Sequence, residues 1–350
     1  MKIIRDFLLC LTFLWPAGAA FSQSAGDAGQ ALEPYAAEFY GVVRIERGGN
    51  SIFEQAYGLA NYQLDVANAP DMRFPLQALT RPLVSAVFHS AADQGVIDLE
   101  ASICAYLSAC PESWNGVKIR HLLNQTSGLP DLSAALEASP QGGPRERLSG
   151  ILQAQEPSAP LYTPGSRYRD SRFDYALAAA VLEAAYGESF ETIMEAQLFK
   201  RAGMSNAGIA APTAAIANMA AGYAMSGGAP EIVCAGETYL PGAEGAYATA
   251  RDLAAFANAL FGERLTTAKM LDAMVTPDYA LSSSHAYGLM TAERDGTLSH
   301  FYGARGDGYA VWLSRYPDHD VTIVILSNQN GAPVNDMRKA LEAALFGNGA

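Results

Sequence analysis

Strand-like segments at both ends of the chain enclose a long helical middle, and this order constrains the fold more than any other feature. Residues 39–58 combine β-branched and aromatic residues with a Gly-Gly-Asn turn at residues 48–50, which predicts a hairpin. Four more strand-like segments follow between residues 287 and 328, before a last helix at residues 336–346. The chain therefore predicts an α+β fold, with an antiparallel sheet formed by its N- and C-terminal segments and a helical region inserted between them.

The helices of the middle region have clear start and stop signals. Apolar residues three and four apart predict a helix over residues 80–94. Ser171 opens a capping box at the start of a second helix, which Gly187 ends. A third helix is expected over residues 249–260, and a short one around residues 31–38.

No domain linker or internal repeat divides the chain. Its 350 residues suffice for two domains or one large one. We expect a single domain over residues 24–348 with two subdomains. Residues 30–75 and 240–348 would form the α/β subdomain, and residues 76–239 the helical one.

The N-terminus has the pattern of a secretory signal peptide, which we place at residues 1–22. Lys2 and Arg5 precede an apolar run over residues 7–15 and then several small residues, so cleavage is expected near residues 20–23. The run is too short to span a bilayer, and no later stretch reaches that length. We therefore expect an exported protein, periplasmic or secreted, without a transmembrane segment in the mature chain.

Export implies an oxidising compartment, where cysteines form disulfides. Cys104 and Cys110 are separated by five residues, and a turn can bring them within bonding range. We expect a Cys104–Cys110 disulfide, with two free buried thiols as the alternative. Cys234 is then left as a small buried apolar residue.

Composition excludes several classes of function. Hydrophobic residues make up 50% of the chain and charged residues 17%, as in a folded protein rather than a disordered one. The net charge of −13 argues against a protein that binds nucleic acid, which would present a basic surface. Five histidines and four cysteines occur without any common zinc-binding spacing, so neither a metal nor a cofactor is expected.

Several sequence blocks resemble one known family. Residues 94–103, 119–131, 164–177, 240–260 and 314–330 match its blocks in the right order; residues 119–131 read IRHLLNQTSGLPD, close to its usual HLLTHTSGLP. The chain is similar to the serine β-lactamase-related proteins, which include class C β-lactamases, DD-peptidases, penicillin-binding proteins and related esterases. The resemblance covers nearly all of the mature chain and implies their fold.

The family's chemistry uses a serine that attacks a carbonyl and forms an acyl-enzyme. It needs Ser-x-x-Lys at the start of a central helix, Tyr-x-Asn or Ser-x-Asn on a loop, and Lys/His-x-Gly on a strand. The resemblance places these motifs on positions that carry other residues here, with His300 two residues too early for the third motif. The positions are Ala78 and Arg81, Asp170 and Arg172, and Tyr302 and Ala304.

These substitutions predict that the family's catalytic residues are absent. Alanine has no nucleophilic atom, and arginine, with a pKa above about 12, cannot act as a general base at neutral pH. We therefore expect a non-catalytic binding or regulatory module for a peptidoglycan-like peptide, a small molecule or a protein partner. The alternative is an active serine hydrolase with a non-standard nucleophile, for which Thr80, Ser85 and Ser171 are the nearest hydroxyls. The oligomeric state is left open.

Opposite charges occupy two of the motif positions. In the family's fold these positions face each other, so we predict a salt bridge between Arg81 and Asp170. Arg172 would supply a second cation for an anionic ligand, and His300 and Tyr302 would complete a ligand groove. The alternative is that Asp170 caps its helix or pairs with a surface cation.

Overall fold

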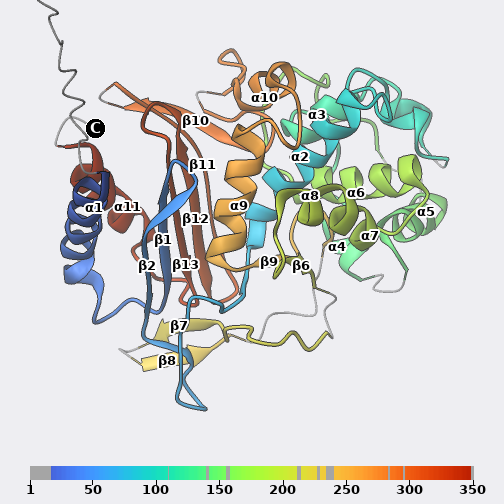
Figure 1. Ribbon diagram of the computed structural model, residues 1–350. Helices are drawn as coiled ribbons and strands as arrows, with labels where there is room; N and C mark the ends of the chain where they lie inside the picture. Colours follow the sequence, from blue (N-terminus) through green and yellow to red (C-terminus); the bar gives the residue numbers. More distant parts are fainter. Residues whose placement is uncertain are drawn as a thin grey trace, which may run out of the picture.

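A six-stranded antiparallel sheet joins the two ends of the chain (Figure 1). The computed structural model describes residues 17–108, 110–138, 142–154, 158–210, 214–226, 229–233, 240–282, 284–294 and 296–347. The strand order is β10-β11-β12-β13-β1-β2. The strands are β1 (Gly41–Arg47), β2 (Asn50–Tyr57), β10 (Met290–Arg294), β11 (Thr297–Gly306), β12 (Tyr309–Tyr316) and β13 (Val321–Ser327). N-terminal β1 pairs with C-terminal β13, from Gly41 opposite Ser327 to Arg47 opposite Val321, which confirms the expected pairing of distant segments.

Helices cover both faces of this sheet. α1 (Ala17–Leu32) packs on α11 (Val334–Phe346) over one face, and α9 (Ala250–Phe261) lies on the other (Figure 1). Successive side chains of a strand point to opposite faces of the sheet, so each strand contributes apolar side chains to the packing on both faces. On β1, Val43 and Ile45 join the core beneath α1 and α11, whereas Val42 joins the larger core on the α9 side.

The helical region lies beyond α9 and centres on α2 (Thr80–Asp93) and α6 (Arg172–Tyr186) (Figure 1). Ser171 caps α6, and Gly187 ends it with a φ of 72°, as the sequence predicts. The other helices are α3 (Ile119–Leu123), α4 (Ser133–Glu137), α5 (Pro144–Ala154), α7 (Phe190–Met194), a π-helical turn η5 (Glu195–Phe199), α8 (Lys200–Ala202) and α10 (Ala268–Val275).

Short turns and small strands complete the structure around the sheet and the helical region. The short 3-10 turns are η1 (Glu33–Tyr35), η2 (Gln77–Leu79), η3 (Ile103–Ala105), η4 (Glu112–Trp114) and η6 (Pro317–His319). The small strands are β3 (Leu59–Asn61), β4 (Val66–Ala67), β5 (Phe74–Pro75), β6 (Gly208–Ile209), β7 (Tyr223–Ser226), β8 (Ala229–Ile232) and β9 (Ala246–Ala248). The predicted division into subdomains at residues 76 and 240 stays a prediction.

The N-terminal helix differs from the expectation. A helix was expected around residues 31–38, but α1 ends at Leu32 and a 3-10 turn follows. Pro34 explains the break, because proline lacks the N–H that would continue an α-helix. Most of the predicted signal peptide, residues 1–16, lies outside the described residues, and α1 includes the expected cleavage region near residues 20–23.

The predicted disulfide is present in the structure. Cys104 and Cys110 are bonded, with their Cα atoms 5.1 Å apart, so the alternative of two free thiols is wrong. Cys234 lies outside the described residues. Within the described part of the chain, no helix is both long enough and apolar enough to cross a membrane.

Candidate functional site

The start of α2 carries the position that the resemblance assigns to the nucleophile. Ala78 lies half-buried in η2, which leads directly into α2. The preceding residue, Gln77, has a φ of 52°, a conformation that residues with a side chain rarely adopt. Such strained positions gather at functional sites. The local backbone is therefore unusual at this point, although the side chain of Ala78 offers no reactive atom.

Arg81 and Asp170 form the predicted salt bridge across the space between α2 and the loop before α6. Arg81 Nη1 lies 2.6 Å from Asp170 Oδ1. The Arg81 side chain is only 4% exposed, whereas that of Asp170 is 64% exposed. Asp170 does not cap the helix, because Ser171 is the N-cap and accepts a hydrogen bond from Asp174 N at 3.1 Å. We call the space around Ala78, Arg81, Asp170 and Tyr302 the groove.

Three further groups surround the Arg81 guanidinium. The Gln125 amide, with its oxygen toward Arg81, accepts from Nη1 at 3.1 Å and donates to Asp170 Oδ1 at 3.0 Å. The ring of Tyr175 lies 5.8 Å away, and the hydroxyl of Tyr302 on β11 forms a hydrogen bond with Arg81. Burial alone would lower the pKa of Arg81, but Tyr302 and Asp170 raise it above its usual value. Arg81 is therefore a permanent cation.

The hydroxyls nearest to Ala78 all have structural roles. Thr80 Oγ1 donates to a backbone carbonyl at 2.8 Å and accepts from the first backbone N–H of β9 at 3.1 Å. Ser85 is fully buried, and its Oγ lies 3.5 Å from His89 Nδ1. Ser171 caps α6. None of the three is oriented as a nucleophile toward the groove.

Arg172 and His300 have partners other than Arg81, and their expected role in the groove stays a prediction. Arg172 lies between two carboxylates, 2.7 Å from Glu137 and 2.6 Å from Glu244, so its charge is neutralised within the protein. His300 is buried, its Nδ1 2.9 Å from Thr291 Oγ1 and its ring stacked on Phe261. Burial, with Arg315 nearby, lowers the pKa of His300 to about 4.

Ala304 is the last of the motif positions. It lies half-buried on β11, two residues beyond Tyr302, opposite Val311 of β12. Its methyl group packs against the large hydrophobic core. It contributes neither charge nor a hydrogen-bonding side chain to the groove.

A buried carboxyl group lies just behind the groove. Asp174, in the first turn of α6, is fully buried, and its Oδ1 accepts from Ser127 Oγ at 2.7 Å. Burial raises the pKa of Asp174 from its usual 3.8 to about 7, against the lowering effect of Ser127, Ser171, Arg169 and Arg81. A group with such a pKa titrates in the physiological range, which makes it a useful probe of this region.

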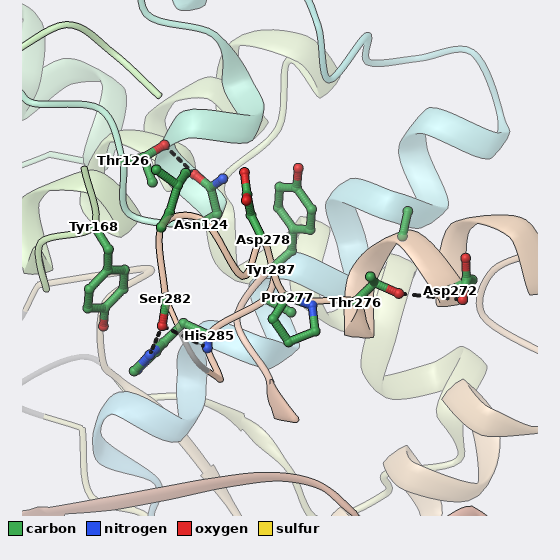
Figure 2. Close-up of a pocket in the computed structure, with 13 residues that line it drawn as sticks. Asn124, Thr126, Tyr168, Asp272, Thr276, Pro277, Asp278, Ser282, His285 and Tyr287 are labelled. Atoms are coloured by element: carbon green, nitrogen blue, oxygen red, sulfur yellow. Dashed lines mark hydrogen bonds between the residues drawn. The ribbon is translucent and has the colours of Figure 1, made fainter. Parts of the chain in front are cut away.

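A small space and a wider cleft lie near the groove. The space left beside Gln125 and Tyr302 is about 10 Å³, roughly enough for one water molecule. The neighbouring cleft has a volume of about 330 Å³ (Figure 2). Its lining includes Asn124, Tyr168, Asp278, Ser282, His285 and Tyr287, and we call this space the cleft. Asn124, Tyr168 and His285 border both spaces.

The cleft contains a polar pair that the sequence reasoning missed. Ser282 Oγ lies 3.0 Å from His285 Nδ1, in the loop after α10 (Figure 2). No known motif marks these residues, and a Ser-x-x-His spacing in a loop is too common to stand out. Among the described residues, no group of three or more His, Cys, Asp or Glu side chains could hold a metal ion.

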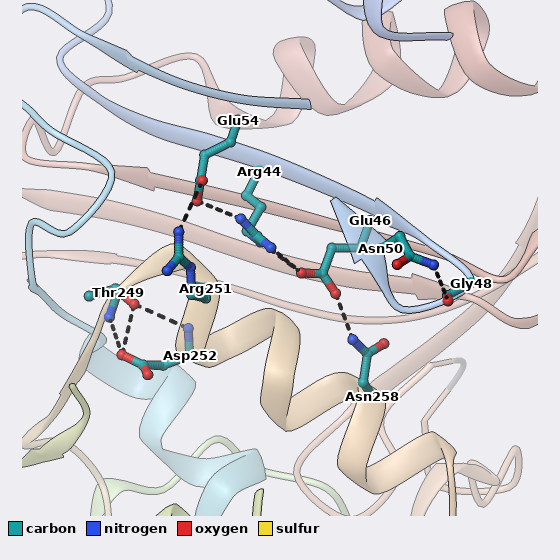
Figure 3. A network of polar contacts seen from close by, with 9 residues as sticks. All are labelled: Arg44, Glu46, Gly48, Asn50, Glu54, Thr249, Arg251, Asp252 and Asn258. Carbon is teal, nitrogen blue, oxygen red and sulfur yellow. Dashed lines mark hydrogen bonds and ion pairs between the residues drawn. The ribbon is translucent and has the colours of Figure 1, made fainter. Parts of the chain in front are cut away.

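Another network of charges joins α9 to the sheet, away from the groove. Arg44 on β1 lies 2.6 Å from Glu46 and 2.7 Å from Glu54, and Asn258 of α9 donates to Glu46 at 2.6 Å (Figure 3). Arg251 adds a long contact of 3.5 Å to Glu54. These pairs lie between packed elements, so buried ion pairs in this protein are not in themselves a sign of a site.

Comparison with known proteins agrees with this architecture. Residues 30–347 match the model of the family described as Beta-lactamase. The chain belongs to the β-lactamase family. A curated relative, the putative penicillin-binding protein PbpX of Bacillus subtilis (strain 168), is 26% identical over 323 residues, which cover 90% of this chain and 78% of the relative.

Solved structures show the same fold for this β-lactamase-family protein. The penicillin binding protein from Bacillus halodurans superposes with a TM-score of 0.78 at 23% identity, covering 90% of this chain and 98% of that chain. The D-amino acid amidase from Ochrobactrum anthropi SV3 gives a TM-score of 0.75 at 18% identity, covering 93% and 99%. The fold is thus the β-lactamase and penicillin-binding-protein fold, with an antiparallel sheet and inserted helices, as the resemblance implied.

Proposed function

We propose that this protein is an exported member of the β-lactamase family that binds its ligand without forming an acyl-enzyme in the groove. One observation carries the proposal. At the position that the resemblance assigns to the catalytic lysine lies a buried, permanently charged Arg81, paired at 2.6 Å with Asp170 at the position assigned to the tyrosine. The protein would then act as a binding or regulatory module.

The chemistry of the groove supports this proposal. Acyl transfer in this family needs a nucleophilic oxygen and a base that can take its proton. Ala78 supplies no oxygen, and the raised pKa of Arg81 makes it a still poorer base than a free arginine. In another serine hydrolase, loss of the nucleophile alone costs about a million-fold in turnover.

The ligand class follows from the neighbours and from the cleft. The curated relative and one solved structure are named penicillin-binding proteins, which supports a peptidoglycan-like peptide or a related small molecule as the ligand. We place the ligand in the cleft of about 330 Å³, which is large enough to hold part of such a molecule. Ligand sites of proteins start at about this size.

The alternative function, a serine hydrolase with a non-standard nucleophile, finds no support in the groove. Thr80, Ser85 and Ser171 are all held in structural hydrogen bonds or buried packing. The observation in its favour lies outside the groove, where Ser282 and His285 are in contact in the cleft.

Calorimetric titration with a muropeptide that ends in D-alanyl-D-alanine tests the proposal, together with a chromogenic cephalosporin assay. We expect saturable binding that dialysis reverses, and no cephalosporin turnover above the buffer rate. Thr276→Trp, at an exposed position that lines the cleft, should abolish binding. The matched control Ala280→Trp, exposed in the same loop but outside the lining, should leave it unchanged. Cephalosporin turnover, or binding that survives Thr276→Trp, would overturn the proposal.

A further inference from the structure

Three histidines in the described part of the chain contact a serine or threonine hydroxyl, and one of these pairs borders open space. Ser85 with His89 and Thr291 with His300 are buried in the protein. Ser282 and His285 both line the cleft, with 3.0 Å between Oγ and Nδ1 (Figure 2). A hydroxyl this close to an imidazole has the arrangement that general-base activation of a nucleophile requires.

The hydrogen bonds around Ser282 fix the direction of its proton. Oγ accepts from the backbone N–H of His285 at 3.1 Å and from that of Ser284 at 3.4 Å. Its own hydrogen is thereby free to point at His285 Nδ1, which accepts it when the ring carries its proton on Nε2. The same two backbone donors would stabilise the negative charge that develops on Oγ as the proton leaves.

The imidazole of His285 is held in place and uncharged. Its ring stacks on Tyr168, with 4.3 Å between the ring centroids and an angle of 29° between the planes. Burial lowers the pKa of His285 below its usual value, Asp170 opposes this effect, and Arg81 adds to it. The ring is therefore neutral at pH 7, the state in which it can accept a proton.

A donor for a substrate oxygen borders the same cleft. Asn124 Oδ1 accepts from Thr126 Oγ1 at 2.6 Å, which orients the amide and leaves Nδ2 as its donating end (Figure 2). Among the described residues, the lining of the cleft includes Asp272 and Asp278 and no lysine or arginine. A neutral or cationic acyl donor suits such a lining better than an anionic one.

We propose that Ser282 is an acylatable serine that reacts with small uncharged or cationic carboxylic esters. Nδ1 of His285 takes the hydroxyl proton as Oγ forms a bond to the ester carbonyl carbon. The bond from that carbon to the alkoxy oxygen breaks, and the proton on Nδ1 passes to the leaving alcohol. In the second step, water bonds to the acyl carbon as it gives a proton to Nδ1 of the same ring. The bond from that carbon to Oγ breaks, Oγ takes the proton back from the ring, and the acid leaves.

This inference goes beyond the proposed function and does not rest on it. The reacting groups belong to the loop after α10 and not to α2, so the groove takes no part. A groove without an acyl-enzyme and a cleft with a reactive serine are compatible in one protein. Their tests are separate, because a penicillin adduct on α2 and an ester adduct on Ser282 map to different peptides.

Intact-protein mass spectrometry with p-nitrophenyl acetate and with an uncharged fluorophosphonate, followed by peptide mapping, tests the proposal. We expect one adduct per chain on the peptide that contains Ser282, and none in Ser282→Ala. His285→Gln keeps the Ser282 hydroxyl but should react at least about a hundredfold more slowly than wild type. Ser51→Ala, which removes an exposed serine of β2 outside the lining of the cleft, should react at the wild-type rate.

Two results would overturn the proposal. One is wild-type protein without an adduct on Ser282, and the other is a His285→Gln variant that reacts as fast as wild type. If Ser282→Ala loses its fold because the loop loses two backbone hydrogen bonds, His285→Gln with circular dichroism as a check on folding still decides the question.

Discussion

The groove and the cleft differ in what their polar groups do. In the groove, the Arg81 guanidinium contacts Asp170, Gln125 and Tyr302, so the polar groups satisfy one another. In the cleft, acidic, aromatic and hydroxyl groups face a space of about 330 Å³.

The difference supports the proposal that the groove forms no acyl-enzyme. A lysine and a tyrosine in the family's arrangement must stay available to a substrate, whereas an arginine and an aspartate can satisfy each other. We therefore expect the groove to act as part of the folded core and the cleft to be the part open to ligands. Substitutions in the groove should therefore lower the free energy of unfolding more than substitutions in the cleft.

Arg81→Ala should have the largest effect on stability. It removes a side chain that is only 4% exposed and leaves Asp170 and Tyr302 without their cation. Loss of this buried side chain leaves a cavity and leaves Gln125 and Tyr302 without their hydrogen-bond partner, which costs about 1–3 kcal/mol. Urea unfolding should show this loss, whereas Arg251→Ala, which removes a 67% exposed side chain, should change stability by less than about 0.5 kcal/mol. Equal losses for the two variants would contradict the account of the groove.

Asp174→Asn should flatten the dependence of stability on pH. The pKa of Asp174 is about 7 in the folded protein and near 3.8 in the unfolded chain, so the folded state binds more protons between these values. The contribution of this group to stability is therefore full below about pH 4 and is lost as the pH rises through 7.

Asparagine cannot ionise, so the variant lacks this slope, which reaches at most about 1.4 kcal/mol per pH unit. The measurement is urea unfolding of both proteins at pH 4.5, 5.5 and 7. The buried histidines are the same in both, so the difference between the curves isolates Asp174. Parallel curves would show that the carboxyl titrates at its ordinary pKa.

Asp170→Asn should cost less than Arg81→Ala, although it breaks the same salt bridge. The Asp170 side chain is 64% exposed, and Arg81 keeps its contacts with Gln125 and Tyr302. Pairs with an exposed partner contribute about 1 kcal/mol or less. A double-mutant cycle with Arg81→Met, which removes the charge, gives the coupling energy of the pair. A loss of stability in Asp170→Asn as large as that in Arg81→Ala would contradict this ranking.

Asp272→Ala, in the cleft, should have the smallest effect. The residue is exposed, and its contact with Thr276 Oγ1 is a long 3.5 Å. Asp272 lies near the C-terminal end of α10, where a negative charge is unfavourable. The midpoint temperature of thermal unfolding should therefore be unchanged or slightly higher in the variant. A clear loss of stability would show that the cleft is part of the packed core after all.

Local signals predicted much of the fold. The Ser171 cap and the Gly187 stop were visible because caps depend on neighbouring residues, and the spacing of Cys104 and Cys110 sufficed for the disulfide. The sheet was predictable because the strand-like segments lie at the two ends of the chain, and strands must pair with other strands. The N-terminal helix was misplaced because the break at Pro34 was overlooked.

The groove was predictable only in part. Two opposite charges at facing motif positions predicted the pair of Arg81 and Asp170. The partners of Arg172, Glu137 and Glu244, lie 35 and 72 residues away in loops and helices whose approach no local pattern reveals. The cleft was missed for the same reason, because its lining comes together only when the loop after α10 folds against α3 and the loop before α6.

The central claim is that the groove forms no acyl-enzyme, and the mass of the intact protein after incubation with benzylpenicillin tests it most directly. Wild-type protein should keep its mass. Ala78→Ser with Arg81→Lys should gain at most a trace of adduct, because Asp170 and Arg172 remain and catalytic groups act as a unit. A gain of one penicillin per wild-type chain, mapped to the peptide of η2 and α2, would contradict the account.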